Sequence, residues 1–214
     1  DLVFNNAGVV IPAGFLNMKE EDWNWCNDIN YNSVINFSRA FLPYLMKDEE
    51  TALVNTSSIF GIITSPNNTV YHASKFAVRG FTESLTKEME GSNTQIHSVY
   101  PGHIGTNIAN YGVKNDRLDF DLDQQNERPN LFGPKAKSKE EVGELFKNQA
   151  PINANTAAKI ILKNIKKKNK RILVGGDARW FDRIQRFFPK KYIYLLPLIP
   201  LIGRLFPKDK LLDR

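Results

Sequence analysis

The stretch "ALVNTSSIFGIITSPNNTVYHASK", residues 52–75, contains the clearest signal of the protein's architecture. It opens with a short apolar run that ends in small polar residues, as a buried strand does at the edge of a sheet. A turn-rich segment, TSPNNT at 64–69, separates this strand from a helical pattern that continues to about Glu90. A strand followed by a long helix is half of a β-α-β unit, whose next strand runs parallel to the first.

The same alternation of strand and helix continues on both sides of this stretch. Three further apolar runs are expected to be strands: LVFNNAG at 2–8, QIHSVYPG at 95–102 and RILVGG at 171–176. Two helices are expected between residues 20 and 46, and another over residues 155–168 with Asn155 as its cap. The pattern predicts an α/β fold with a doubly wound parallel sheet and helices on both faces.

Composition and charge narrow the class of protein. The 214 residues, 42% of them hydrophobic, can bury one sizeable core. A single cysteine, Cys26, excludes an internal disulfide framework and predicts a reducing, cytoplasmic compartment. Residues 1–162 hold 14 basic and 19 acidic side chains, whereas residues 163–214 hold 15 basic and 4 acidic ones. This asymmetry favours an anionic partner, either a membrane surface or a nucleic acid.

Tyr71 and Lys75 stand one helical turn apart and therefore share a face of their helix. A lone pair of this kind can simply decorate a helix surface, so its meaning depends on partners elsewhere. Small polar or turn residues close three predicted strands: Asn5 to Gly8, Ser57 with Ser58, and Pro101 with Gly102. Because ligands bind beyond the carboxyl ends of parallel strands, these closures predict a site beside Tyr71 and Lys75.

Together the motifs resemble the short-chain dehydrogenase/reductase family, the NAD(P)-dependent Rossmann-fold oxidoreductases. The matching pieces come in the family's order: NNAG at 5–8, Asn30 in INYNSV, NTSS at 55–58, YHASK at 71–75 and PGHIGT at 101–106. The resemblance covers residues 1–110 tightly and 150–176 loosely. It implies one Rossmann-like domain, with residues 1–176 as its carboxyl-terminal part, a substrate loop at about 107–150 and a basic, apolar tail at 177–214.

The chemistry of these residues agrees with the resemblance. A tyrosine could protonate a carbonyl oxygen during reduction, or accept the proton of an alcohol during oxidation. A free tyrosine with a pKa near 10 is a poor base, and we expect Lys75 to lower the pKa of Tyr71. Ser58, which lies 13 residues before Tyr71, could donate a hydrogen bond to the substrate oxygen. Ser57 is interpreted as a bystander.

The resemblance also implies specific roles. The catalytic residues are Asn30, Ser58, Tyr71 and Lys75, with Asn30 holding a water molecule that links Lys75 to solvent. The cofactor, NAD or NADP, is expected to contact Asn6, Ala7, Gly8, Tyr71, Lys75, Pro101, Gly102, Ile104 and Thr106. Two simpler alternatives stay open: Asn30 could cap a helix, and Ser58 could merely end a strand.

The family's glycine-rich turn, which seats the pyrophosphate on a helix N-terminus, is missing from these 214 residues. We expect it upstream of Asp1, because the chain begins directly in a strand and its first methionine is Met18. The sequence therefore does not distinguish NAD from NADP. A competing hypothesis is a non-catalytic fragment that acts as a membrane-associated or interaction module.

No metal site is predicted. His72, His97 and His103 have no metal-ligand spacing, and we interpret them as structural or surface residues. The acidic segment DRLDFDLD, residues 116–123, is interpreted as a solvated loop.

The tail favours one kind of anionic partner. Its apolar run at 192–203 contains Pro197 and Pro200, and it is too short and too broken to span a bilayer. Aromatic side chains flanked by lysines and arginines suit a lipid headgroup boundary, and KNIKKKNKR at 163–171 adds six positive charges. We expect a peripheral membrane contact, a lipophilic carbonyl or alcohol substrate and no nucleic-acid partner. The alternative is a tail that folds over the substrate cleft or against a partner subunit of a homo-oligomer.

Overall fold

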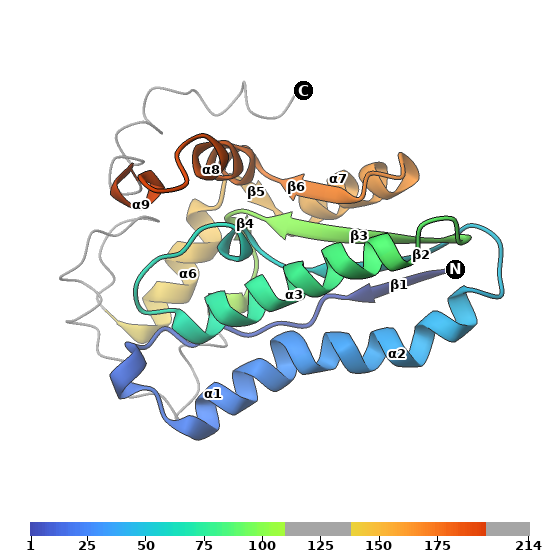
Figure 1. Ribbon diagram of the computed structural model, residues 1–214. Coiled ribbons are helices and arrows are strands. Elements are labelled where there is room, and N and C mark those ends of the chain that lie inside the picture. Colours follow the sequence, from blue (N-terminus) through green and yellow to red (C-terminus); the bar gives the residue numbers. More distant parts are fainter. Residues whose placement is uncertain (110–137, 196–214) are drawn as a thin grey trace.

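The computed structural model describes residues 1–109 and 138–195, in which strands and helices alternate around a four-stranded sheet (Figure 1). The strands are β1 (Leu2–Asn5), β2 (Thr51–Thr56), β3 (Thr94–Pro101) and β6 (Arg171–Val174). They lie in the order β1-β2-β3-β6, and every neighbouring pair is parallel. The predicted α/β fold with a parallel sheet is confirmed.

Helices connect these strands and cover the sheet. They are α1 (Glu20–Asn27), α2 (Ser33–Leu45), α3 (Thr69–Glu88), α6 (Lys139–Gln149), α7 (Ala154–Lys166), α8 (Gly176–Phe187) and α9 (Tyr192–Leu195). Single helical turns occur at η1 (Phe15–Asn17), η2 (Asp28–Asn32) and η3 (Ile59–Gly61). A short parallel pairing of β4 (Ile104–Gly105) with β5 (Ile152–Asn153) forms a separate small sheet.

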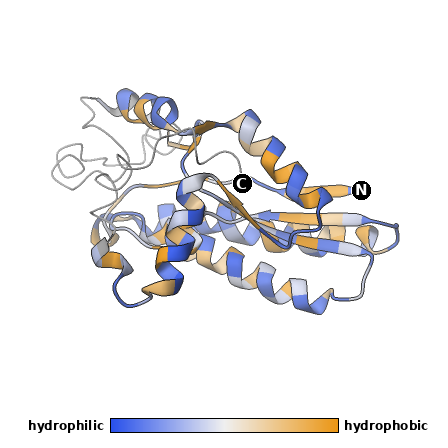
Figure 2. Ribbon diagram, turned by 90° about the horizontal axis from the view of Figure 1, so that it is seen from above, coloured by the Kyte–Doolittle hydropathy of each residue, from blue (hydrophilic) through white to orange (hydrophobic). Residues whose placement is uncertain are grey.

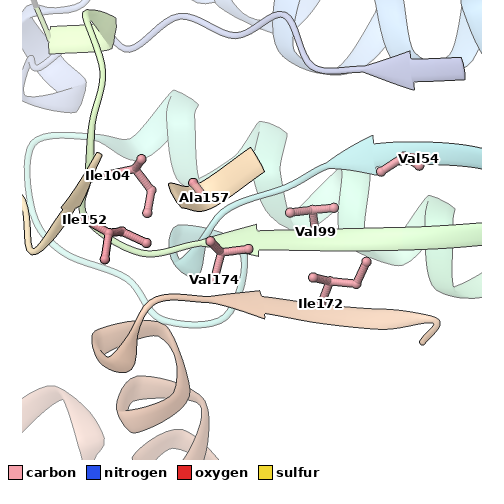
Figure 3. Close-up of a cluster of buried hydrophobic side chains, with 7 residues drawn as sticks. All are labelled: Val54, Val99, Ile104, Ile152, Ala157, Ile172 and Val174. Atoms are coloured by element: carbon pink, nitrogen blue, oxygen red, sulfur yellow. The ribbon is translucent and has the colours of Figure 1, made fainter. Parts of the chain in front are cut away.

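Successive strand side chains build a core on each face of the sheet. On one face Leu53 packs with Leu45 of α2 and Leu85 of α3. Its neighbour Val54 points to the opposite face and belongs to the cluster that contains Ala157 of α7 (Figure 3). Burial on both faces explains why the strands read as nearly continuous apolar runs. The helices, in contrast, alternate hydrophobic and hydrophilic residues along their length (Figure 2).

Helix α8 packs as part of the sheet domain, although residues from 177 onward were predicted to form a tail. Its Ala178 and Phe181 are buried against Tyr100 of β3 and Ile59 of η3. Arg171 of β6 fixes the same face, because its guanidinium bonds both Glu83 of α3 and Asp182 of α8. The later part of the predicted tail, residues 196–214, lies outside the described residues.

Two local features differ from the predicted elements. The helices expected between residues 20 and 46 form one helical run, in which the π turn η2 joins α1 to α2. Helix α7 is capped by Asn153 rather than Asn155: Asn153 is extended, and its side chain accepts a hydrogen bond from the Thr156 N–H at 2.9 Å. A cap is defined by the backbone conformation before the helix, which two nearby asparagines do not reveal in a sequence.

Buried histidines make the stability of this fold depend on pH. His97 lies in the middle of β3, where its Nδ1 is 2.8 Å from the Asn169 carbonyl oxygen and its Nε2 has no partner among the described residues. Burial lowers the pKa of His97, and it also lowers the pKa of His72 and of His103. These three side chains are therefore held in their neutral forms.

We predict that the free energy of unfolding decreases as the pH falls from 7.5 to 5.5. The unfolded chain binds these protons at a pKa of about 6.5, above the folded values, so the contribution is complete above that pH and is lost below it. One histidine can contribute up to about 1.4 kcal/mol per pH unit. Urea unfolding at the two pH values measures the slope, and His97→Gln should reduce it. A stability that is flat or rises toward pH 5.5 would contradict the prediction.

Candidate active site

Tyr71 and Lys75 lie on the first turns of α3, beyond the carboxyl end of β2, and both are buried. The Lys75 ammonium is 5.7 Å from the centre of the Tyr71 ring, and it donates a hydrogen bond to the Thr56 carbonyl oxygen at 3.0 Å. The pair therefore faces the end of the sheet rather than solvent. Surface decoration, the simpler interpretation of this motif, is wrong.

The two serines that close β2 have different partners. Ser58 begins η3, where its hydroxyl oxygen accepts a hydrogen bond from the Phe60 N–H at 3.1 Å. The Ser58 side chain also lies near enough to the Tyr71 phenol to act against the rise in its pKa. Ser57 instead donates to the Lys75 carbonyl oxygen at 2.7 Å. Ser58 thus belongs to the polar group around the phenol, whereas Ser57 holds the backbone of α3 against the strand end.

Asn30 is fully buried in the π turn η2 and does not cap a helix. Its side-chain amide pairs with the backbone of Val9 in both directions, accepting from the N–H and donating to the carbonyl oxygen, each at 2.8 Å. Its Nδ2 also donates to the Ser74 hydroxyl at 3.1 Å, and Ser74 donates to the Tyr71 carbonyl oxygen at 2.8 Å. Asn30 therefore links the segment after β1 to the start of α3. Single π turns of this kind occur frequently at functional sites.

Burial shifts the pKa of Tyr71 and the pKa of Lys75 in the direction that favours the uncharged form of each group. It raises the pKa of Tyr71 to about 12, although the neighbouring Ser58 side chain acts in the opposite direction. It lowers the pKa of Lys75 to about 8. The prediction that Lys75 lowers the pKa of Tyr71 is therefore wrong for the cofactor-free protein. Desolvation raises this pKa by more than the neighbouring groups lower it. At neutral pH Tyr71 carries its proton and can act as an acid.

The segment after β1 leaves room beside Lys75. A Cβ atom on Gly8 would lie 3.3 Å from the Lys75 Nζ, which is tight, and 3.5 Å from the Asn30 Oδ1, which is an ordinary contact, so a side chain there would crowd the ammonium. Asn6 and Ala7 are exposed at the same edge of the sheet. An ammonium can donate three hydrogen bonds, and Thr56 is its one acceptor in the described part of the chain. The remaining donors suit the hydroxyl groups of a ribose.

The segment 101–106 lies at the carboxyl end of β3, the same edge of the sheet. Pro101, Gly102 and Thr106 are partly exposed, whereas Ile104 is buried. The Ile104 side chain packs with Ile152 in the hydrophobic cluster (Figure 3), so this residue could offer a ligand its backbone but not its side chain. The structure thus brings all the predicted site residues to one edge of the sheet.

All three histidines are buried, and each contacts a backbone group of another segment. The ring of His72 lies 3.0 Å from the Phe60 carbonyl oxygen and from the Ser65 N–H, which holds the loop after Ser58. His103 contacts the Phe146 carbonyl oxygen of α6 at 2.6 Å. Within residues 1–109 and 138–195, no three His, Cys, Asp or Glu residues are grouped so as to hold a metal ion. The acidic segment 116–123 lies outside the described residues.

Three contributors to the site were missed from the sequence. Ser74 connects Asn30 to Tyr71, and its position between Tyr71 and Lys75 is a signal that could have found it. Asp177 follows β6 and accepts a hydrogen bond from the His103 N–H at 2.5 Å. The other site motifs also follow the ends of strands, so an acidic residue just beyond a strand is a signal that could have found Asp177. The Thr56 carbonyl left no signal, because a backbone group can belong to any residue type.

Residues 1–117 match the family model described as short chain dehydrogenase. The chain belongs to the short-chain dehydrogenase family. The 3-oxoacyl-(acyl-carrier-protein) reductase FabG of Thermotoga maritima is 40% identical over 106 residues, which cover 50% of this chain and 43% of that protein. The putative oxidoreductase SadH of Mycobacterium tuberculosis is 31% identical over 193 residues, or 89% of this chain and 63% of SadH. The chain thus spans less than two thirds of either relative.

Solved structures of short-chain dehydrogenases have the same architecture. One from Burkholderia phymatum, in complex with NAD, has a TM-score of 0.70 and 25% identity, covering 87% of this chain and 65% of that one. Another from Burkholderia cenocepacia, in complex with NADP, has a TM-score of 0.67 and 21% identity, covering 91% and 68%; this likeness concerns the fold alone. The family and the Rossmann-like fold predicted from the motifs are confirmed.

We predict that Lys75→Met stabilises the cofactor-free protein at pH 7. The buried ammonium has a lowered pKa, so its charged form opposes folding at neutral pH, and methionine fills similar space without a charge. The lost hydrogen bond to Thr56 offsets part of this gain, so we expect the free energy of unfolding to rise by roughly 1–3 kcal/mol. Denaturant unfolding measures the change, with the exposed Lys87→Met as the matched control. Equal or lower stability of Lys75→Met would contradict the assigned cost of burial.

Proposed function

We propose that this chain is the catalytic part of an oxidoreductase that transfers a hydride between NAD or NADP and a carbonyl or alcohol. The observation that carries the proposal is a protonated, buried tyrosine whose pKa is affected by the neighbouring Ser58 side chain, with the Lys75 ammonium 5.7 Å from its ring. These groups lie at the carboxyl edge of a parallel sheet, where α/β proteins bind their ligands.

In the reductive direction Tyr71 donates its proton to the carbonyl oxygen of the substrate, and a bound reduced nicotinamide would supply the hydride. Ser58 donates a hydrogen bond to the same oxygen, where negative charge develops. The nearby Lys75 ammonium then stabilises the phenolate that proton loss leaves on Tyr71. In the oxidative direction the same tyrosine, as phenolate, accepts the proton of the alcohol.

The cofactor is assigned to the surface formed by Asn6, Ala7 and Gly8, by Lys75 and by the segment 101–106. Lys75 would hold the ribose hydroxyls with its remaining donors, and Asn30 would hold a water molecule through the second lone pair of its Oδ1. The related structure solved with NAD supports a nicotinamide dinucleotide. The name of one relative, a 3-oxoacyl reductase, supports carbonyl–alcohol chemistry, and the name of another, a putative oxidoreductase, supports redox chemistry in general.

We predict that Tyr71→Phe in the full-length protein lowers kcat by at least about 10²-fold, the usual loss when a general acid–base group is removed. The ring and its packing against Phe60 are retained, so stability should change little. Tyr100→Phe is the matched control, since it removes the hydroxyl of a buried tyrosine that bonds Glu83. Steady-state turnover with a panel of aldehydes, ketones and alcohols measures both variants. Near-normal turnover by Tyr71→Phe would refute the mechanism.

A second proposal is peripheral attachment to an anionic membrane, with a lipophilic carbonyl or alcohol as the substrate. Exposed hydrophobic side chains follow one another at the end of α8 and in α9, and Lys190 and Lys191 lie between them: Phe187, Phe188, Ile193 and Tyr194. Hydrophobic side chains beside lysines suit insertion at the headgroup boundary of an anionic bilayer. Among residues 1–109 and 138–195, no helix is long and apolar enough to cross a membrane.

The structure separates the two basic clusters that were predicted to act together. The run at 163–171 lies at the amino end of β6, where Lys168 and Lys170 form ion pairs with Glu50 and Glu90. Helix α9 lies at the opposite end of the sheet, the end of the proposed active site (Figure 1). The lysines beside the exposed aromatics are therefore better placed for a shared membrane contact than the earlier run.

We predict that the full-length protein sediments with anionic liposomes at low salt. Serine in place of Phe187, Phe188, Ile193 and Tyr194 should lower the bound fraction at least about fivefold, because the apolar area that enters the lipid is lost. Glutamine in place of Lys163, Lys166 and Lys167 is the control and should change binding less. A supernatant fraction that is equal for all three proteins would contradict attachment. Size-exclusion chromatography shows whether the exposed side chains cover a second subunit instead.

A non-catalytic module is the competing function, and the two experiments separate it from the enzyme. Such a module would bind liposomes, but the full-length protein would show no turnover with any combination of substrate and cofactor. The enzyme proposal requires turnover that depends on Tyr71.

A further inference from the structure

The carboxylate of Asp177 lies between the ends of two neighbouring strands. It follows the turn after β6 and faces Gly102 in the turn after β3. Its Oδ2 accepts a hydrogen bond from the His103 N–H at 2.5 Å. Its Oδ1 is buried without a partner among the described residues. The side chain therefore bridges α8 and the segment 101–106.

Two glycines make room for this carboxylate. A Cβ atom on Gly102 would overlap both carboxylate oxygens, and a Cβ atom on Gly175 would overlap Oδ1. Gly175 also has φ of +106°, a conformation that other residues rarely adopt. The two turns and the carboxylate therefore fit one another as a unit, in which a larger side chain at either glycine would displace Asp177.

The same turn is tied to two other elements. The Gly102 N–H donates to the Val174 carbonyl oxygen of β6 at 2.9 Å. The His103 ring contacts the Phe146 carbonyl oxygen of α6 at 2.6 Å and packs against the Phe146 ring. Asp177 bonds the backbone between these two contacts, at the His103 N–H. The position of the turn thus depends on a carboxylate contributed by a residue 74 positions away in the chain.

A buried carboxylate is a costly way to fix a turn. Its charged form loses hydration, and the loss is offset in part by the backbone N–H groups at the start of α8. The cost is understandable if the turn must be held in one position for a ligand. The neighbouring residues Pro101, Gly102, Ile104 and Thr106 are those assigned above to the cofactor.

We propose that Asp177 is a positioning residue for the nicotinamide end of the cofactor. By accepting the hydrogen bond from His103, it holds the backbone of the segment 101–106 where the nicotinamide would bind. The inference rests on the function proposed above. Asp177 does not touch the reacting atoms, and it acts through the backbone of the turn.

The test compares two ligands of the full-length protein by calorimetry. ADP-ribose, or its 2′-phosphate if the protein uses NADP, shares the adenosine and pyrophosphate of the cofactor but lacks the nicotinamide. Asp177→Ala should weaken binding of the intact cofactor at least about tenfold, as expected when a hydrogen bond to a charged group is lost, and leave the affinity for ADP-ribose unchanged. Asp177→Asn keeps an acceptor oxygen and should restore most of the affinity.

Asp182→Asn is the matched control, because it alters another buried carboxylate of α8 that bonds Arg171 and Arg186 rather than the turn. Equal losses for both ligands in Asp177→Ala, or the same selective loss in Asp182→Asn, would overturn the inference. If Asp177→Ala does not fold, Gly102→Ala replaces it and should show the same selective loss; an unchanged ratio of the two affinities would overturn the inference. Failure of the unaltered protein to bind either ligand would instead refute the proposed function, and the inference with it.

Discussion

The proposed site depends on a lysine ammonium that is held inside the protein. Water no longer solvates Lys75, and the Thr56 carbonyl replaces one of its hydrogen bonds. Burying a charged group destabilises a folded protein, so buried charges are found mainly at functional sites, where the charge takes part in binding or catalysis. The surrounding arrangement follows from this requirement: Gly8 leaves space beside the ammonium, and the Tyr71 phenol lies within reach of its field.

The sheet brings these groups together through a buried polar contact between strands. Asn5 and Asn55 are register partners in β1 and β2, and the Asn5 amide donates to the Asn55 side-chain oxygen at 2.8 Å. Asn55 in turn donates to Thr82 of α3 at 3.1 Å. A slip of one residue would break these bonds and turn the apolar side chains to the wrong faces. The register therefore determines where Gly8 and Thr56 lie relative to Lys75.

Features that depend on local periodicity could be predicted from the sequence. The strands, their small polar ends and the pairing of Tyr71 with Lys75 follow from the spacing of residue types, and the structure places them as expected. Features set by distant parts of the chain were missed. The pKa of Tyr71 depends on burial by other segments, and the contact of Asp177 with His103 joins two turns that are far apart in sequence.

Isotope transfer is the most direct test of hydride chemistry at this edge of the sheet. The full-length protein would be incubated with a reduced nicotinamide cofactor carrying two deuterium atoms at C4, together with a panel of lipophilic ketones and aldehydes. Mass spectrometry and NMR would then locate the label in the alcohol product. If the protein transfers a hydride from C4 of the cofactor, each product molecule should carry one deuterium on its carbinol carbon. Alcohol formed without deuterium at that carbon, or no alcohol from any substrate of the panel, would contradict this expectation.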